Sequence, residues 1–348
     1  MDLILRWYGP DDPVAPAHIR QIPYVRGVAT ALHGVAPGVV WSPSAIAERQ
    51  ERLAVDGLAW TVTESIPVHE DIKLGAPGRD RAIETWARTA ENLGAAGAMT
   101  VCYNFMPVFD WMRTDLAVVA SDGSKSSEYR HEDLLRIDIS QGMEALPAWA
   151  EAYSAARMAE LRAAYADVDA ERLWDNLAYF LERVVPVAAA AGVRLAIHPD
   201  DPPWPIFGFP RIITGEESLA LVLSLVDDEA NGLTFCTGSL GATPNNDLVA
   251  MARRFAPTGR IHFGHFRNVK WTGDRSFVEV AHPRAFGSVD LVAVIQALVE
   301  GGFDGPVRPD HGRMIWGETG IPGYGLHDRA LGAMYIAGAW EAAGGQIG

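Results

Sequence analysis

The chain contains 348 residues, of which 49% are hydrophobic, and its formal net charge is −15 at pH 7. This length can bury a large core and suits either one large α/β barrel or two smaller domains. The negative charge argues against nucleic acid or an anionic membrane as partner, because proteins that bind phosphates normally carry a basic surface. The sequence shows no secretory signal segment and no apolar run long enough to span a bilayer, which favours a cytoplasmic protein.

Eight short apolar segments alternate with helical patterns along the chain. Each segment is flanked by Gly or Pro and is rich in residues that favour strands. The segments begin at Leu3, Gly27, Trp60, Met99, Val193, Leu233, Ile261 and Pro306. Eight strand-and-helix units in one chain predict an α/β fold, a (β/α)8 TIM barrel, as a single domain over residues 1–348.

Between these segments, apolar residues recur at spacings of three and four, the pattern of helices that pack one face on a barrel. The expected helices cover residues 44–56, 79–97, 171–192, 215–225, 245–255, 288–301 and 326–343. The stretch 110–170, after the fourth strand, does not follow the alternation, and it contains an expected helix from Pro147 to Ala166. Such an insertion commonly forms a lid or a subunit interface. Together with the last helix, it favours a homodimer or a larger homo-oligomer.

Potential metal ligands stand at the ends of four consecutive predicted strands, where barrels of this type carry their active sites. From the fifth strand to the eighth, they are His198, Cys236, His265 and Asp310. Because neighbouring strands lie about 4.8 Å apart, these side chains could converge on one ion. No short Cys-x-x-Cys motif is present, so an open catalytic site for a divalent metal is expected rather than a closed structural one. His262 competes with His265, which is preferred because it lies nearer the strand end.

The donor set leaves the identity of the metal open. A thiolate and two imidazoles favour zinc or ferrous iron, whereas a carboxylate and an oxygen-rich substrate would also suit manganese. Cationic and hydrogen-bonding residues stand near the same strand ends: Arg6, His33, His69, Asn104, Arg267, Asn268, Arg308 and Arg313. Such a set can hold an anionic substrate despite the negative net charge, and we expect at least one arginine to bind a substrate carboxylate.

Distinctive strings run through nearly the whole chain: LRWYGPDDPV, ESIPVHEDIK, VCYNFMPVFDW, AIHPDDPPWPIFGFPRIITG, RNVK, RPDHGRMIWGE and PGYGLHDRALGAMY. In these strings the sequence closely resembles the mannonate dehydratase family, which has a xylose-isomerase-like barrel. The resemblance implies the dehydration of D-mannonate to 2-keto-3-deoxy-D-gluconate in hexuronate catabolism, with a divalent ion that is usually manganese. Ferrous iron is the second choice and zinc is less favoured.

The resemblance also assigns roles to particular residues. It places the metal ligands on the four strand-end residues already named and the catalytic tyrosine on Tyr324, in the PGYG turn. His327 departs from the family pattern, because a tyrosine is common at that position. This difference leaves room for a shifted substrate preference.

Dehydration of a sugar acid needs a base to take the C2 proton and an acid to protonate the departing C3 hydroxyl. The candidates are Tyr324 and His311, with Asp310 as a third if it is only loosely bound to the metal. The direction of the pair stays open. We expect Asp200 and Asp201 to orient metal ligands or substrate hydroxyls.

Three other functions compete with this interpretation. One is a dehydratase of another six-carbon sugar acid, because the sequence does not distinguish C2 epimers. Another is a metal-dependent sugar isomerase or epimerase on the same barrel, although such sites rely mainly on carboxylates and Cys236 argues against them. The third is a noncatalytic protein that binds a sugar acid. In each case the partner is a small molecule.

Overall fold

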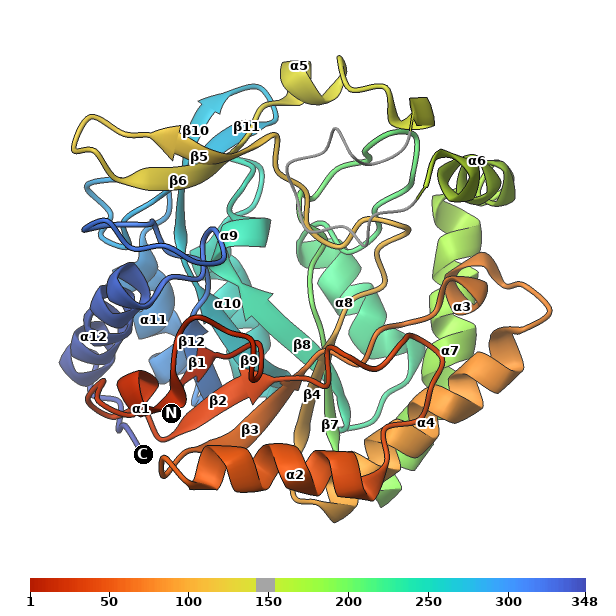
Figure 1. The fold of residues 1–348 in the computed structure, drawn as a ribbon, viewed down its shortest axis with the longest axis horizontal. Coiled ribbons are helices and arrows are strands. Elements are labelled where there is room, and N and C mark those ends of the chain that lie inside the picture. The colour runs from red at the N-terminus through yellow and green to blue at the C-terminus, as the bar shows by residue number, and fades with distance from the viewer. Residues whose placement is uncertain (142–153) are drawn as a thin grey trace.

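The barrel predicted from the sequence is present. The computed structural model describes residues 1–141 and 154–348, and eight parallel strands close in the order β1-β12-β9-β8-β7-β4-β3-β2 (Figure 1). The strands are β1 Asp2–Arg6, β2 Gly27–Thr30, β3 Ala59–Glu64, β4 Thr100–Tyr103, β7 Arg194–Ile197, β8 Asn231–Cys236, β9 Ile261–Phe266 and β12 Pro306–Pro309. Each strand overlaps one predicted segment, so the α/β barrel prediction is confirmed.

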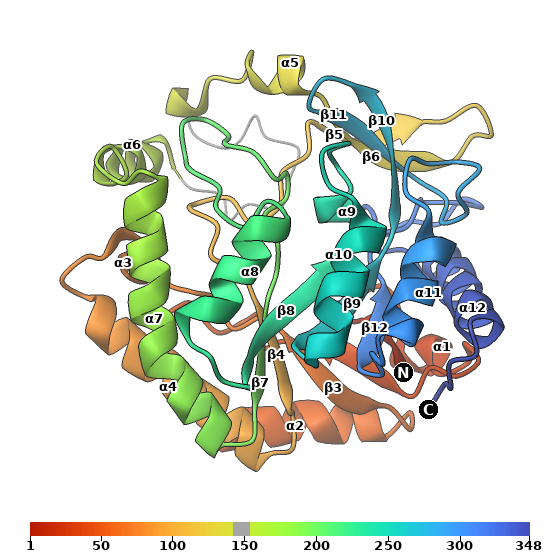
Figure 2. The same cartoon turned by 180° about the vertical axis from the view of Figure 1, so that it is seen from behind.

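Helices surround the barrel on its outside (Figures 1 and 2). The longer ones are α2 Pro43–Ala54, α4 Arg79–Ala95, α7 Ala170–Ala190, α8 Glu216–Leu225, α10 Leu248–Phe255, α11 Leu291–Glu300 and α12 Leu326–Ala342. Each of these overlaps an expected helix. The connections contain α1 Pro16–Ile19, α3 Glu70–Leu74, α9 Thr237–Leu240 and the 3₁₀ turn η2 Ala256–Thr258.

A second sheet, which the sequence analysis did not predict, stands beyond the carboxyl ends of the barrel strands. It is antiparallel, in the order β10-β11-β6-β5, and joins two hairpins that are far apart in the chain (Figures 1 and 2). Its strands are β5 Asp115–Val119, β6 Lys125–Tyr129, β10 Asn268–Gly273 and β11 Ser276–Val280. Because β10 begins two residues after β9 ends, this sheet is held directly over the end of the barrel where the site is expected.

The described remainder of the stretch 110–170 contains short helices joined by loops. It contains α5 His131–Leu134, the 3₁₀ turn η1 Ile139–Gln141 and α6 Ala155–Ala164. The helix α6 lies within the expected helix 147–166. The first part of that expected helix, residues 147–153, lies outside the described residues.

Two apolar clusters hold the barrel together. A small one fills its interior, with one side chain from each of six strands: Ile4, Ala29, Val62, Cys102, Ala196 and Phe263. A much larger one fills the space between the strands and the helices. Burial of apolar surface is the main stabilising contribution to such a fold. The interior cluster also separates the amino end of the barrel from the polar groups at its carboxyl end.

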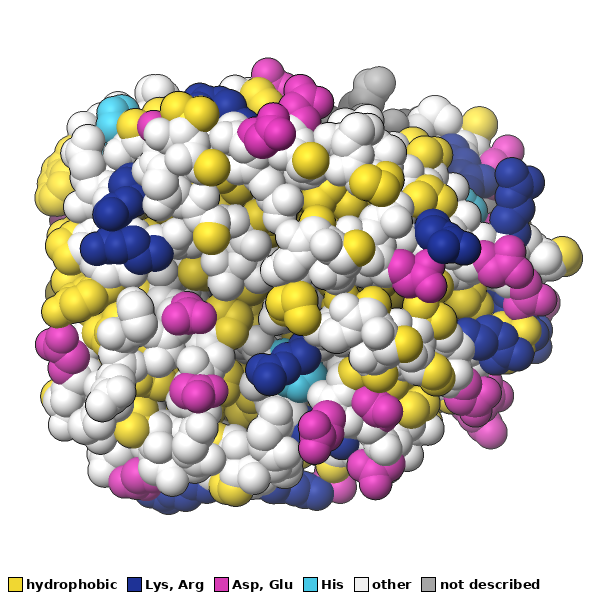
Figure 3. All heavy atoms as spheres, turned by 90° about the horizontal axis from the view of Figure 1, so that it is seen from below, with side chains coloured by type: hydrophobic (Ala, Val, Ile, Leu, Met, Phe, Trp, Pro, Cys, Tyr) yellow, Lys and Arg dark blue, Asp and Glu magenta, His cyan; other side chains and the backbone are white. Residues whose placement is uncertain are grey.

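The outer surface is mixed in charge where Figure 3 shows it. On that face, acidic and basic side chains alternate with hydrophobic and neutral ones, and no wide basic area is visible. In the part of the chain that the structure describes, no helix combines the length and the apolar composition needed to cross a bilayer.

Candidate metal and active site

Neighbouring barrel strands place site residues at the same height along the barrel axis. Cys236 on β8 pairs in register with His265 on β9, and His265 pairs with Arg308 on β12. His198 follows β7 directly, and Pro199 after it cannot donate a ladder hydrogen bond. Cys236 and His265 are completely buried. The barrel therefore brings two imidazoles and a thiol together at its carboxyl end.

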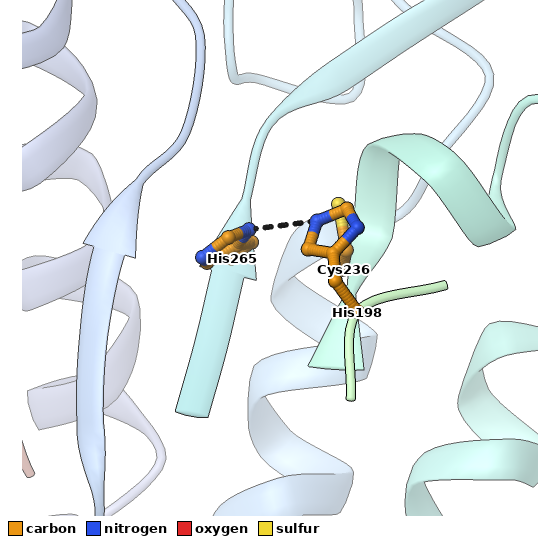
Figure 4. Close-up of side chains that lie close together, drawn as sticks. All are labelled: His198, Cys236 and His265. Carbon is orange, nitrogen blue, oxygen red and sulfur yellow. Dashed lines mark hydrogen bonds between the residues drawn. The ribbon is translucent and has the colours of Figure 1, made fainter. Parts of the chain in front are cut away.

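The two histidines face each other (Figure 4). Nδ1 of His198 donates a hydrogen bond to the carbonyl oxygen of Pro199 at 2.7 Å, which leaves Nε2 of the neutral ring without a proton. This Nε2 lies 3.1 Å from Nδ1 of His265. The ligand atoms of His198, His265 and Cys236 all lie within 4.8 Å of one another.

Asp310 borders this group from the end of β12. Its Oδ2 lies 3.6 Å from Sγ of Cys236, and its Oδ1 lies 3.8 Å from Nδ1 of His265. Arg308 donates to Oδ1 at 2.8 Å and Arg267 donates to Oδ2 at 2.7 Å. Each carboxylate oxygen still has a second lone pair. Burial alone would raise the pKa of Asp310, but the cationic groups around it hold that pKa well below its usual range, so the carboxylate is ionised.

These donors fit a divalent metal ion. Two imidazole nitrogens bound to one ion at about 2.1 Å lie about 3.0 to 3.4 Å apart, depending on the bond angle. The observed separation of 3.1 Å between His198 and His265 agrees with this value. The ring orientation of His198, with the second nitrogen donating to a carbonyl, is typical of a metal-binding histidine. His198, Cys236 and His265 could therefore hold a metal, and Asp310 lies where a fourth ligand would be.

In a second group, the ligand atoms of Glu64, Cys102 and His265 also lie within 4.8 Å of one another. Glu64, however, forms ion pairs with Arg308 at 2.8 Å and with Arg6 at 3.2 Å. Burial raises the pKa of the Cys102 thiol well above its ordinary value, which opposes the thiolate that a metal needs. The first group is thus the better metal site.

His262, the alternative ligand, lies on the other face of β9. Residues three apart in a strand point to opposite faces. Nδ1 of His262 donates to the carbonyl oxygen of Leu195 at 2.7 Å. Its ring covers Gly232, where an added Cβ would lie 2.4 Å from the imidazole. His262 therefore packs between strands, and it is His265 that lies beside His198.

A buried charge network surrounds the metal-ligand group. It consists of four arginines and four carboxylates: Arg6, Arg113, Arg267, Arg308, Glu64, Asp201, Glu279 and Asp310. None of these side chains is more than 13% exposed. Buried charges are expensive to desolvate, so they need well-placed opposite charges and hydrogen bonds. The equal numbers of positive and negative groups meet this requirement.

Two predicted substrate-binding residues, Arg267 and Arg308, belong to this network. Arg267 donates to Asp201, Glu279 and Asp310, and Arg308 donates to Glu64 through two nitrogens at 3.0 and 2.8 Å. Each arginine is 1% exposed. Their guanidinium groups are therefore engaged by carboxylates of the protein itself.

Arg6 differs from the other arginines of the network. Its Nη1 approaches Glu64 at 3.2 Å, but its buried Nε has no hydrogen-bond partner among the described residues. A buried donor without an acceptor is costly. Arg6 is therefore the member of the network with a donor available for an anionic ligand.

Asn268 and Arg313 make structural contacts. Asn268 is completely buried, and its amide donates to the carbonyls of His282 and Val289, both at 3.0 Å, and accepts from the N–H of Val289. Arg313 binds Asp328 at 2.8 Å and also pairs with an aspartate of the β5-β6 turn. These contacts use the groups that were expected to bind substrate.

The remaining residues that were predicted near the substrate are less buried. Asn104 accepts from the N–H of Met106 at 3.3 Å, and His69 caps α3 by accepting from the N–H of Asp71 at 3.1 Å. His33 is exposed, and its ring centre lies 5.3 Å from that of Tyr8. Among residues 1–141 and 154–348, no hydrogen bond uses the side-chain nitrogen of Asn104, which leaves this donor for a ligand in the described part of the site.

Tyr324 and His311, the predicted acid and base, form a hydrogen-bonded pair. The distance between the Tyr324 hydroxyl and Nε2 of His311 is 2.8 Å. Nδ1 of His311 lies 2.7 Å from Oε1 of Glu279, which can only accept when ionised. Burial alone would raise the pKa of Glu279, but His311 and two arginines together lower it to about 2. Burial also raises the pKa of Tyr324 well above its ordinary value, so the phenol keeps its proton.

Sequence reasoning gave no role to several residues of the site. Glu279 and Arg113 come from the second sheet and from the segment that leads into it, and that sheet was not predicted. Glu64 ends β3, whereas the predicted metal ligands came only from the ends of the fifth to eighth strands. Tyr8 packs edge-on against Tyr324, with ring centres 4.9 Å apart. The signal available in the sequence was position: Glu64 and Tyr8 both lie at the ends of barrel strands.

Comparison with known proteins agrees with the geometry. The profile of the family described as D-mannonate dehydratase (UxuA) matches residues 1–346. The chain belongs to the D-mannonate dehydratase (UxuA) family. It is 50% identical to the mannonate dehydratase of Streptococcus uberis over 342 residues, which are 98% of each chain. It is 52% identical to that of Thermotoga maritima over an alignment of 352 positions, which covers 98% of each chain. The family resemblance read from the sequence is confirmed.

Solved structures support the fold. The crystal structure of mannonate dehydratase from Streptococcus suis serotype 2 matches with a TM-score of 0.92 and 46% identity, over 99% of this chain and 95% of that chain. A xylose-isomerase-like TIM barrel protein from Mycobacterium smegmatis, solved in complex with magnesium, matches with a TM-score of 0.57 at 15% identity, over 98% of this chain and 97% of that one. The second likeness shows a shared barrel.

Proposed function

We propose that this protein is a metal-dependent mannonate dehydratase, a hydro-lyase that converts D-mannonate to 2-keto-3-deoxy-D-gluconate and water in hexuronate catabolism. The observation that carries the proposal is the placement of the metal-ligand group beside the hydrogen-bonded pair of Tyr324 and His311. The names of the relatives support the same reaction.

The charge balance of the site favours an acid as substrate. The four arginines and four carboxylates of the network cancel when the histidines are neutral. A divalent ion bound with the thiolate of Cys236 would add one net positive charge. A buried excess charge is costly, and one substrate carboxylate would neutralise it. This argument favours a sugar acid over the neutral sugar of an isomerase or epimerase.

The groups of the chain can carry out the proton transfers. We propose that His198, Cys236, His265 and Asp310 hold the metal, which supplies a Lewis acid that stabilises charge on the substrate carboxylate. Arg6 offers its free Nε to the substrate. Of Tyr324 and His311, one removes the C2 proton and the other gives a proton to the C3 hydroxyl, which leaves as water.

We propose manganese as the metal, with ferrous iron as the second choice and zinc as the third. The family resemblance favours manganese. The donor set contains one carboxylate, which suits manganese, and two imidazoles and one thiolate, which suit iron and zinc better.

The test is formation of 2-keto-3-deoxy acid by metal-stripped protein to which Mn²⁺, Fe²⁺ or Zn²⁺ is added back. The substrates are D-mannonate, its C2 epimer D-gluconate and neutral D-mannose. We expect turnover of D-mannonate that needs the metal. Turnover of the epimer alone would move the proposal to another sugar acid. Isomerisation of the neutral sugar, or binding of D-mannonate without its loss, would contradict the dehydratase assignment.

Arg6→Met tests the charge argument in the same assay. Because Arg6 has the available donor, we expect KM for D-mannonate to rise about 10-fold or more, as for the loss of a charge-assisted hydrogen bond. The matched control is Arg254→Met, on the outer helix α10, whose side chain is partly exposed and pairs with Glu216, and where KM should not change. An unchanged KM in the Arg6 variant would assign substrate binding to another group.

A further inference from the structure

The second sheet delivers one side chain into the site. Glu279 lies on β11, outside the barrel, yet its side chain is only 4% exposed and reaches His311 at the end of β12. The strand β11 pairs with β10, which continues from β9, and with β6 from the insertion after β4. Two segments of the chain that are not part of the barrel therefore hold Glu279 in place.

Every hydrogen bond between the Glu279 carboxylate and the described residues goes to one oxygen, Oε1. Oε1 accepts from Nδ1 of His311 at 2.7 Å, from Nε and Nη2 of Arg113 at 3.1 and 2.7 Å, and from Nη1 of Arg267 at 3.0 Å. The other oxygen, Oε2, is buried and has no partner among the described residues. The two arginines thus keep Oε1 aimed at the imidazole.

We propose that Glu279 is a positioning residue that sets the tautomer of His311, and this inference rests on the proposed function. A carboxylate oxygen facing Nδ1 requires the proton of the neutral ring to be on Nδ1. Nε2 then carries the lone pair, and the hydroxyl of Tyr324 donates to it. If the proton were on Nε2 instead, the lone pair of Nδ1 would face a lone pair of Oε1 of Glu279. The N–H at Nε2 would then face the O–H of Tyr324, and the phenol could no longer donate to the ring.

This arrangement has a chemical consequence. When the Tyr324 O–H bond breaks and an N–H bond forms at Nε2 of His311, the products are a phenolate and an imidazolium, and the proton count is unchanged. The carboxylate of Glu279 stabilises that imidazolium without taking its proton. Loss of an orienting carboxylate of this kind lowered kcat about 10⁴-fold in a serine protease, through the wrong tautomer.

The direct test measures the tautomer of His311 in the unmodified protein. Long-range ¹H–¹⁵N correlation spectra of protein labelled with ¹⁵N-histidine and loaded with diamagnetic Zn²⁺ distinguish a protonated Nδ1 from a protonated Nε2. The signals of His311 are those that disappear in His311→Gln. We expect the proton on Nδ1. A proton on Nε2 alone would overturn the inference, whether or not the protein turns over D-mannonate.

The kinetic test uses three variants. Glu279→Leu removes the acceptor, and we expect kcat on D-mannonate to fall about 100-fold or more with KM and metal content nearly unchanged. Asp201→Leu removes the other carboxylate that Arg113 and Arg267 share, but not the partner of His311. Glu128→Leu makes the same change on β6, at the position paired with Val278.

We expect kcat to fall much less in Asp201→Leu than in Glu279→Leu, and not at all in Glu128→Leu. Glu279→Asp, which retains a carboxylate, should recover part of the lost kcat. An equal loss in the Asp201 and Glu279 variants would reduce Glu279 to a structural member of the charge network. If Glu279→Leu does not fold, the spectra of the unmodified protein decide the question alone.

Discussion

The site and the packed parts of the barrel contain the same kinds of residue in opposite roles. On β9, His262 packs between strands, while His265 lies beside His198 three residues later. Cys102 belongs to the apolar cluster inside the barrel, while Cys236 borders two histidines and a carboxylate. The comparison teaches that residue type alone does not make a ligand. The level along the strand and the face of the strand decide it.

The two cysteines give the largest expected effect. Cys236→Ala removes a proposed metal ligand, and we expect bound metal to be lost and turnover of D-mannonate to fall about 1,000-fold or more. Cys102→Ala, its matched control, removes one buried sulfur from the interior cluster. It should keep metal and activity while lowering the free energy of unfolding by about 1 kcal/mol.

Metal content by elemental analysis, the initial rate and urea denaturation check these outcomes. Loss of metal in the Cys102 variant, with metal retained in the Cys236 variant, would move the site to the group of Glu64, Cys102 and His265.

The second largest expected effect is a difference in stability between variants of a buried and an exposed arginine. Arg113 pairs with Asp201 and Glu279, both at 2.7 Å, and its side chain is completely buried. We expect Arg113→Met to lower the free energy of unfolding by about 3 to 5 kcal/mol, because two buried carboxylates lose a partner. Arg254 makes similar contacts at 2.7 and 3.2 Å, but its side chain is 44% exposed.

Arg254→Met is therefore the control, and it should cost at most about 1 kcal/mol, because water screens exposed pairs. Urea denaturation of both variants measures the difference. Equal losses would mean that the buried network contributes no more than a surface pair.

The barrel could be predicted from the sequence because each strand carries its own local signal. The segment VRLAIHP, for example, combines strand-forming residues with a proline that stops the strand. The proximity of the candidate ligands could be predicted for the same reason, since the carboxyl ends of neighbouring strands meet. Position along a strand was sufficient to predict that His198 and Cys236 lie close together.

The second sheet and the carboxylates that the buried arginines bind could not be predicted in this way. In β6, the segment KSSEY has little apolar character, and its pairing with β11 joins residues more than a hundred positions apart. Arg308 looked available for a substrate, but a sequence does not show that Glu64 on a distant strand engages two of its nitrogens. Which of two charged groups takes a partner depends on packing in three dimensions.

The smallest expected effect returns to His262 and concerns pH. Burial lowers its pKa to about 4 in the folded protein, against about 6.5 for an unfolded chain. As the pH falls below about 6.5, the unfolded chain binds a proton that the folded protein does not accept, so acid favours unfolding. The stability associated with this residue is complete above about pH 6.5 and decreases by about 1.4 kcal/mol per pH unit toward pH 4.

His262→Gln keeps a group that can donate to Leu195 but does not titrate. We therefore expect the difference in unfolding free energy between the unmodified protein and this variant to shift in favour of the variant as the pH falls from 6.5 to 4.5. Urea denaturation at a series of pH values measures the shift. A pH-independent difference would show that the ring is protonated as easily in the fold as in water, which its burial between strands opposes.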